Sequence, residues 1–187
     1  MNIFILDEDP QLAASYHCDK HVCKMILESG QMLCTAHWVS WLGHFGKKRS
    51  DFNLVRDMQA FLFEEVPAQK QPPWKLTHLN HPCSVWTRET KENYVWHHGL
   101  MGFLLDEYSE RYNRTHKSEK VWSWLLENTP VAFSDSGLKP FPICMKEEYK
   151  VSDDPVECYR EYYIKDKVRF AKWKKGNVPK WWTIKVS

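Results

Sequence analysis

The chain has 187 residues, of which 43% are hydrophobic and 27% charged, a composition typical of one folded domain and not of a disordered protein. The net charge of +2 at pH 7 favours no class of partner by itself. No apolar stretch is long enough to cross a membrane, and the start MNIFILDEDP lacks the apolar run of a signal peptide. Six cysteines without a CxxC pair favour reduced thiols. We expect one domain, residues 1–187, in the cytoplasm and without a membrane partner.

The first third of the chain reads as an extended segment followed by helices. Residues 2–6 are apolar after the first position and predict a short strand or extended segment. Asp9 and Pro10 then form a helix start, with an acidic N-cap and a proline at the first helical position. The pattern predicts a long helix from Pro10 to about Ala36, fading near Gly43, and a second helix around Phe52–Glu65.

The remaining elements follow from proline positions and apolar spacing. Three prolines predict a loop over residues 66–81, and Asn80-His81-Pro82 repeats the helix-start signal for a helix to about Asn113. We expect a shorter helix over Ser118–Glu127, an ordered surface loop over residues 128–152, and a last helix from Asp154-Pro155 to about Lys175. The expected fold is mainly α, a single compact helical domain with a short extended segment at its start.

The first predicted helix carries a narrow polar stripe. At about 100° per residue, six polar side chains fall within roughly 80° of one another, and apolar residues occupy the other sides. These six are His17, His21, Lys24, Glu28, Gln31 and Thr35. A helix that is apolar on three sides is mostly buried, so the stripe is expected to face a cavity. We therefore predict catalytic roles for His17, His21, Lys24 and Glu28, with Gln31 beside them in substrate binding.

The third predicted helix presents a matching face. Trp86 and Asn93 align on it, and an indole can stack on an extruded base while an amide reads a pyrimidine edge. His81, at the helix start, can bind an anion together with the local amides. The alternatives are that Asn93 is a core amide satisfied by the protein itself, and that His81 only neighbours the cap.

The end of the chain is basic and aromatic. From Tyr159 to Ser187 there are nine Lys or Arg and two acidic residues, so this segment has a net charge of +7. The remainder of the chain therefore has a net charge of −5. Such a basic segment suits a surface that follows phosphates and stacks bases, although a solvated basic helix is the alternative. The residues predicted to bind DNA are Arg160, Tyr163, Lys167, Arg169, Lys172, Trp173 and Lys174. Ten Trp in one chain fit base stacking or, alternatively, a Trp-rich core.

The first predicted helix also carries residues that could bind a metal. His17 and His21 have the i, i+4 spacing of metal ligands, and Cys18 and Cys23 are nearby in sequence. On a helix, however, the two cysteines point about 100° or more away from the histidines. We therefore expect neither a metal nor another cofactor. Cys83, close to His81 in sequence, is the thiol to test as a nucleophile.

Four strings resemble a family of small phage-encoded proteins: MNIFILDEDP, HCDKHVCKMILESGQMLCTAH, HPCSVWTRETKENY and PFPICMKEEYK. The resemblance covers most of the chain. The family is distantly similar to helical pyrimidine-dimer DNA glycosylases of the endonuclease V type, which implies a DNA-glycosylase-like helical fold. It also resembles the amino acid:DNA transferases of thymidine hypermodification. Those transferases replace the phosphate of 5-phosphomethyl-deoxyuridine in duplex DNA with an amino acid such as glycine.

The resemblance implies an enzyme with double-stranded DNA and a free amino acid as partners, in an infected bacterial host. In the glycosylases the nucleophile is the α-amine exposed by removal of the initiator Met, but Asn2 is bulky enough to keep Met1 in place. Met1 also leads into the apolar segment Ile3–Leu6, which places its amine away from the chemistry. Glu28 matches the acidic residue on the glycosylases' first helix. The balance favours group transfer, with a DNA glycosylase and a non-catalytic DNA-binding accessory protein as alternatives.

Overall fold

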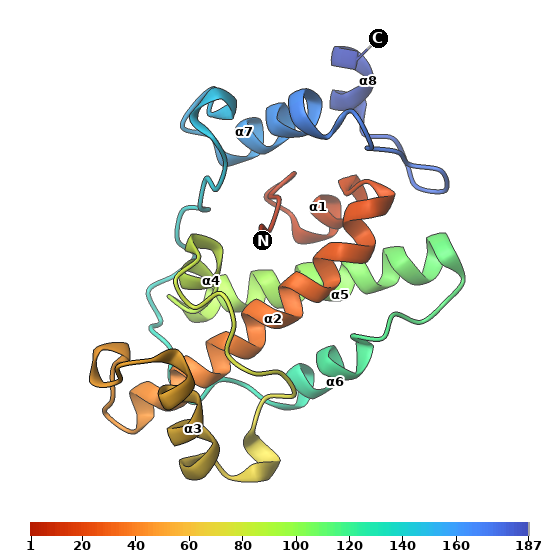
Figure 1. Ribbon diagram of the computed structural model, residues 1–187. Helices are drawn as coiled ribbons and strands as arrows, with labels where there is room; N and C mark the ends of the chain where they lie inside the picture. The colour runs from red at the N-terminus through yellow and green to blue at the C-terminus, as the bar shows by residue number, and fades with distance from the viewer. Residues whose placement is uncertain (187) are drawn as a thin grey trace.

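The computed structural model describes residues 1–186, with side chains through Thr183. This part of the chain is mainly helical and contains no strand, only one isolated parallel bridge between Thr90 and Ser134 (Figure 1). The mainly α prediction is therefore confirmed. The helices are α1 Pro10–Tyr16, α2 Asp19–His44, α3 Val55–Glu65, α4 Pro82–Thr87, α5 Lys91–Tyr112, α6 Glu119–Glu127, α7 Pro155–Tyr162 and α8 Lys180–Val186.

Two long helices, α2 and α5, cross at the centre of the molecule (Figure 1). Their facing residues are fully buried, among them Ile26 of α2 and Leu100 of α5. Two glycines permit close packing: a Cβ on Gly30 would come within 2.6 Å of Trp74, and one on Gly102 within 2.9 Å of Trp122. A smaller apolar cluster joins the end of α2 to α3. No helix in the described part of the chain combines the length and apolar character needed to cross a bilayer.

The first predicted helix is two helices, which corrects the expectation of one helix from Pro10. Asp9 caps α1 as predicted, because its carboxylate accepts the backbone N–H groups of Gln11 and Leu12. The chain then leaves the helical region at His17 and Cys18, whose ψ angles are 132° and 158°. The second helix, α2, stays regular beyond Ala36 and ends at His44, next to Gly43, where the pattern was predicted to fade.

The third predicted helix is also interrupted, between α4 and α5. Thr90 begins α5 as its N-cap, because its hydroxyl oxygen accepts the N–H of Asn93 at 3.1 Å. The helix ends where predicted, at Asn113, which adopts a left-handed conformation with φ 52°. The predicted positions of α3 and α6 agree with the structure to within three residues.

The predicted last helix is wrong in length. The α-helix ends at Tyr162 and is followed by a π-helical turn over Tyr163–Lys167. A non-helical segment then leads to α8, a helix that the sequence pattern did not indicate. Residues 2–6, predicted to be a short strand or an extended segment, form no strand, and Phe4 within this segment adopts a left-handed backbone with φ 53°. The segment is fully buried at Ile3, Ile5 and Leu6, and it lies between α2 and α7 in Figure 1. This segment places Met1 and Asn2 against α2.

Candidate active site

The Glu28 carboxylate lies in the middle of α2 with three nitrogen partners. One oxygen is 3.0 Å from Lys24 Nζ; the other accepts the backbone N–H of Asn2 at 3.0 Å and lies 3.8 Å from the Met1 amino group. The Glu28 side chain is 10% exposed, whereas that of Lys24, one turn earlier, is 57% exposed. The site therefore presents a cation at the surface with a carboxylate directly beneath it.

Met1 contributes its amino group to this site, contrary to the expectation from the buried segment that follows it. The Met1 side chain is only 2% exposed, although the residue as a whole is half-buried. The exposed part of Met1 therefore belongs to its main-chain atoms. An ammonium group and a carboxylate thus meet at the point where the extended segment reaches α2.

The two histidines of the predicted stripe lie in an aromatic core. His17 Nδ1 donates to the Ala13 carbonyl at 2.7 Å, while His21 is hydrogen-bonded to the Tyr163 hydroxyl and stacks on Phe4. Burial lowers the pKa of His17 to about 4 and that of His21 to about 2. Both are therefore neutral at pH 7. A cationic role for either histidine in catalysis is therefore not supported, and Lys24 is the cation next to Glu28.

Buried neutral histidines make the stability of the fold depend on pH. Burial lowers the pKa of four histidines to between about 2 and about 4, from an ordinary value of 6.5; they are His17, His21, His37 and His97. The unfolded chain therefore binds more protons than the folded one below pH 6.5, so stability is complete above that pH and falls as the pH drops toward 4. Each histidine contributes up to about 1.4 kcal/mol per pH unit.

We therefore expect the urea midpoint of unfolding to fall steeply between pH 6.5 and pH 5. This window lies above the pH at which most carboxylates titrate, so the slope reports the histidines. His44→Gln, which changes an exposed histidine at the end of α2, should leave the slope unchanged. A midpoint that is constant across this window would contradict the burial of four neutral histidines.

The predicted base-binding residues of α4 and α5 are engaged within the protein. Trp86 is 4% exposed, donates its indole N–H to the Lys139 carbonyl, and packs against Phe141. The Asn93 amide donates to the Trp86 carbonyl and accepts the Lys139 N–H, both at 2.8 Å. These contacts attach residues 128–152 to α4 and α5. They also occupy the Trp86 indole N–H and the Asn93 amide oxygen, which were expected to face a base. The alternative of a satisfied core amide is the better description of Asn93. Gln31, half-buried on α2, is three residues beyond Glu28.

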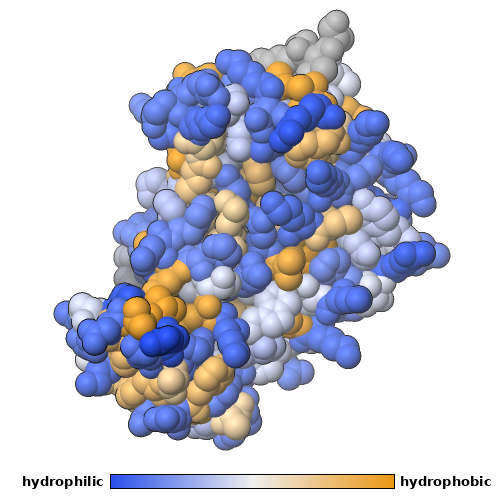
Figure 2. All heavy atoms as spheres, viewed as in Figure 1, coloured by the Kyte–Doolittle hydropathy of each residue, from blue (hydrophilic) through white to orange (hydrophobic). Residues whose placement is uncertain are grey.

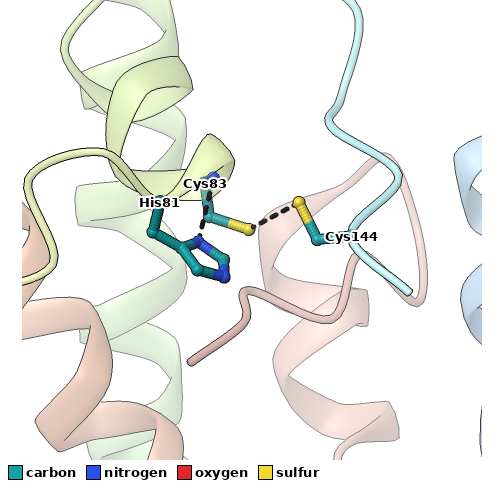
Figure 3. Close-up of side chains that lie close together, drawn as sticks. All are labelled: His81, Cys83 and Cys144. Atoms are coloured by element: carbon teal, nitrogen blue, oxygen red, sulfur yellow. Dashed lines mark hydrogen bonds between the residues drawn. The ribbon is translucent and has the colours of Figure 1, made fainter. Parts of the chain in front are cut away.

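Three potential metal ligands converge next to this site. His81 and Cys83 come from the start of α4 and Cys144 from the loop over residues 128–152, and their side chains point toward one another (Figure 3). His81 caps α4, because its Nδ1 accepts the Cys83 N–H at 3.2 Å. Partial burial lowers the pKa of His81; the Met1 amino group lowers it further, while Glu28 acts in the opposite direction. The sequence indicated His81 and Cys83 but gave no signal for Cys144, which lies 61 residues further on.

A basic groove lies at the other end of this face of α2, where Asp19 and Lys20 begin the helix. Its volume is about 560 Å³. The lining residues are Asp19, Lys20, Tyr108, Arg111, Tyr112, Arg114, Phe170, Lys172, Lys174 and Lys175. Five exposed cations and three aromatic rings, with the buried Arg111 and its partner Asp19 at the base, form a surface suited to phosphates and bases. An adjoining cavity of about 670 Å³ shares Tyr108 and Arg114 and adds the half-buried Trp74.

Asp19 holds the basic groove together. Its backbone N–H donates to the Lys172 carbonyl, and its carboxylate accepts the N–H of Lys174, both at 2.8 Å. These two bonds attach the non-helical segment after the π-helical turn to the start of α2. The segment therefore places its lysines opposite Lys20, an arrangement that a continuous helix to Lys175 would not give.

The residues predicted to bind DNA divide into three groups. Arg169, Lys172 and Lys174 are exposed, and the two lysines line the basic groove. Tyr163 and Trp173 are buried in the core, so their predicted stacking on DNA bases is not supported. Arg160 and Lys167 are half-buried and pair with Asp7 and Asp166. Figure 2 shows polar residues over most of one face, with apolar residues in separate small patches.

Comparison with known proteins identified no family for this chain. No family model, no curated protein and no solved structure matches it.

Proposed function

We propose that this protein is an enzyme that modifies a base in duplex DNA by transferring an amino acid onto the 5-methylene of 5-phosphomethyl-deoxyuridine, with release of phosphate. The observation that supports this most is the contact between Lys24 and Glu28, one exposed and the other buried, 3.0 Å apart. The reaction brings together a leaving phosphate and an incoming ammonium group. It therefore needs a cation and a carboxylate at one place.

The transfer step exchanges one bond at the methylene carbon. The ammonium group of the amino acid gives a proton to Glu28, and the resulting amine attacks the methylene. The new C–N bond forms as the C–O bond to phosphate breaks, and the electron pair of that bond leaves with inorganic phosphate. Lys24 neutralises charge on the departing oxygens. The glycosidic bond takes no part.

The DNA is proposed to lie along the basic groove. Lys20, Lys24 and Glu28 follow one another at four-residue intervals on α2, so Lys20 is about 12 Å from Glu28 along the helix. The target base has to leave the stack to reach Glu28. Since Trp86 is engaged in the core, the aromatic rings available on the proposed DNA surface are those that line the basic groove: Tyr108, Tyr112 and Phe170.

Removing three lysines from the basic groove should weaken DNA binding and its dependence on salt. The slope of log affinity against log salt should fall by up to about 2.7, or about 0.9 for each phosphate that the protein no longer neutralises. The variant carries Lys20→Ala, Lys172→Ala and Lys174→Ala. A control carries the same change at three exposed lysines elsewhere: Lys47, Lys70 and Lys120. Fluorescence anisotropy with a short duplex measures both slopes, and an equal decrease in the two variants would exclude the groove as the DNA site.

Base excision is the second candidate, favoured by the Met1 amino group 3.8 Å from Glu28. An amine beside a carboxylate is the pair that the resemblance to endonuclease V type glycosylases implies. An amine that attacks the sugar carbon displaces the base, and a carboxylate stabilises the positive charge that develops there. Adding residues before Met1 would remove this amine from the site and stop excision, whereas transfer does not require it.

Mass spectrometry of nucleosides separates the two reactions. Duplex DNA containing 5-phosphomethyl-deoxyuridine is incubated with the protein and a mixture of amino acids, and then digested. A nucleoside in which phosphate is replaced by an amino acid supports transfer and identifies the donor. An abasic site supports excision. DNA that is bound but returns unchanged would contradict both reactions and favour an accessory DNA-binding protein.

A further inference from the structure

We propose that His81, Cys83 and Cys144 form a zinc-binding site. One ligand atom from each residue lies within 4.8 Å of the other two, and the two sulfur atoms are 3.4 Å apart. Ligands about 2.0 to 2.3 Å from a tetrahedral zinc ion are about 3.3 to 3.8 Å from one another. The two sulfur atoms are therefore already within about 0.4 Å of the spacing that zinc needs, and the imidazole has to move toward them by at most about 1.3 Å. One imidazole and two thiols are also the donor types that zinc prefers.

The protein holds the third ligand in position before any ion binds. The Asn2 side-chain amide donates to the Cys144 carbonyl at 2.8 Å, and the Tyr159 hydroxyl accepts the Cys144 N–H at 3.2 Å. Asn2 Oδ1 also lies 3.9 Å from Cys83 Sγ. Residues around a metal site that fix its ligands in this way are a general feature of zinc proteins. Two segments distant in sequence are thus fixed around one point (Figure 3).

The set of ligands leaves one position of a tetrahedral ion open. Three protein ligands with a free fourth position are typical of zinc sites that bind a substrate or water, whereas structural sites usually have four. Asn2 joins the two sites, because its N–H donates to Glu28 while its side chain contacts Cys83 and Cys144. The proposed zinc site and Glu28 therefore share Asn2 as a supporting residue. Zinc binding itself does not depend on which reaction the enzyme performs.

Titration of the reduced, metal-free protein with Co²⁺ and then Zn²⁺ tests the site. We expect one ion per chain, a thiolate-to-cobalt charge-transfer band that zinc abolishes, and release of protons as the two thiols ionise. Cys144→Ser and His81→Ala should each weaken binding by more than about 100-fold, since loss of supporting residues alone costs about 10- to 100-fold. Cys23→Ser, which changes a half-buried thiol on α2, should bind as tightly as the unchanged protein.

A milder variant separates loss of the site from loss of the fold. Tyr159→Phe keeps the ring but removes the hydroxyl that accepts the Cys144 N–H, and it should weaken cobalt binding by about 10-fold while helicity is unchanged. The proposal is overturned if the reduced protein binds no stoichiometric ion, or if both ligand variants bind as tightly as Cys23→Ser. Isolation of the chain with a Cys83–Cys144 disulfide that persists in zinc-containing buffer would also overturn it. None of these outcomes bears on DNA transfer or excision.

Discussion

Glu28→Gln is expected to lower the rate of base modification by about 10²- to 10⁴-fold, the range that a positioned proton acceptor contributes. The glutamine keeps an oxygen that can accept the Asn2 N–H, now bonded at 3.0 Å, so the extended segment should stay in place. What it removes is the group that takes the proton from the incoming ammonium. Duplex DNA affinity should be unchanged, because Glu28 is not among the residues that line the basic groove. Initial rates in the nucleoside assay and anisotropy with the same duplex measure the two effects.

The matched control for this change is Glu64→Gln, at an exposed position on α3. It removes one carboxylate from a helix of the same protein without touching the site, and should keep the full rate. If Glu28→Gln keeps a near-normal rate with an unchanged melting temperature, Glu28 is not the proton acceptor and the proposed site is wrong. If Glu28→Gln unfolds, Glu28→Asp tests the same role with the charge retained and the carboxylate drawn back by one methylene.

The helical content was predictable from local signals, but the breaks in the helices were not. Asp9 and Pro10 allowed the start of α1 to be predicted, and Asn113, which is left-handed in the structure, marks the predicted end of α5. Both ends are predictable because capping depends on residues that are neighbours in sequence. The interruption at His17 and Cys18 depends instead on Arg111, which donates to the carbonyls of Ser15 and His17 from 94 or more residues away. No local pattern contains that information.

The candidate site was likewise predictable where it depends on local sequence and not where it depends on contacts between distant segments. The sequence pointed to Lys24 and Glu28 because their spacing places them on one face of a helix, and the structure brings the two together. The helical projection at about 100° per residue was wrong for His17, because it assumed one continuous helix across the interruption at His17 and Cys18. Asn2 and Cys144 were missed because their roles come from tertiary contacts: the Asn2 side chain donates to the Cys144 carbonyl 142 residues away. The sequence pattern of one helix shows which of its residues share a face, but it does not show which residues of other segments contact that face.

Arg111 ties together the parts that form this site. Its side chain is 2% exposed and donates to the carbonyls of Ser15 and His17 at 3.0 and 2.8 Å. It pairs with Asp19 at 3.2 Å and with Glu107 at 2.6 Å. These contacts join α1, the start of α2 and α5 through one guanidinium group. The same group packs closely on the segment after the π-helical turn, since a Cβ on Gly176 would come within 2.6 Å of Arg111.

Replacing Arg111 with Met should therefore destabilise the fold by about 3 to 5 kcal/mol, as removal of one partner of a buried ion pair does. Methionine fills part of the space but leaves the Ser15 and His17 carbonyls without this donor and the Asp19 and Glu107 carboxylates without their guanidinium partner. Urea denaturation at pH 7.5 measures the decrease in stability. Arg56→Met, which removes an arginine that is 82% exposed and paired on the surface of α3, should change stability by less than about 1 kcal/mol. Equal effects of the two changes would mean that Arg111 is not the residue that fixes the break between α1 and α2.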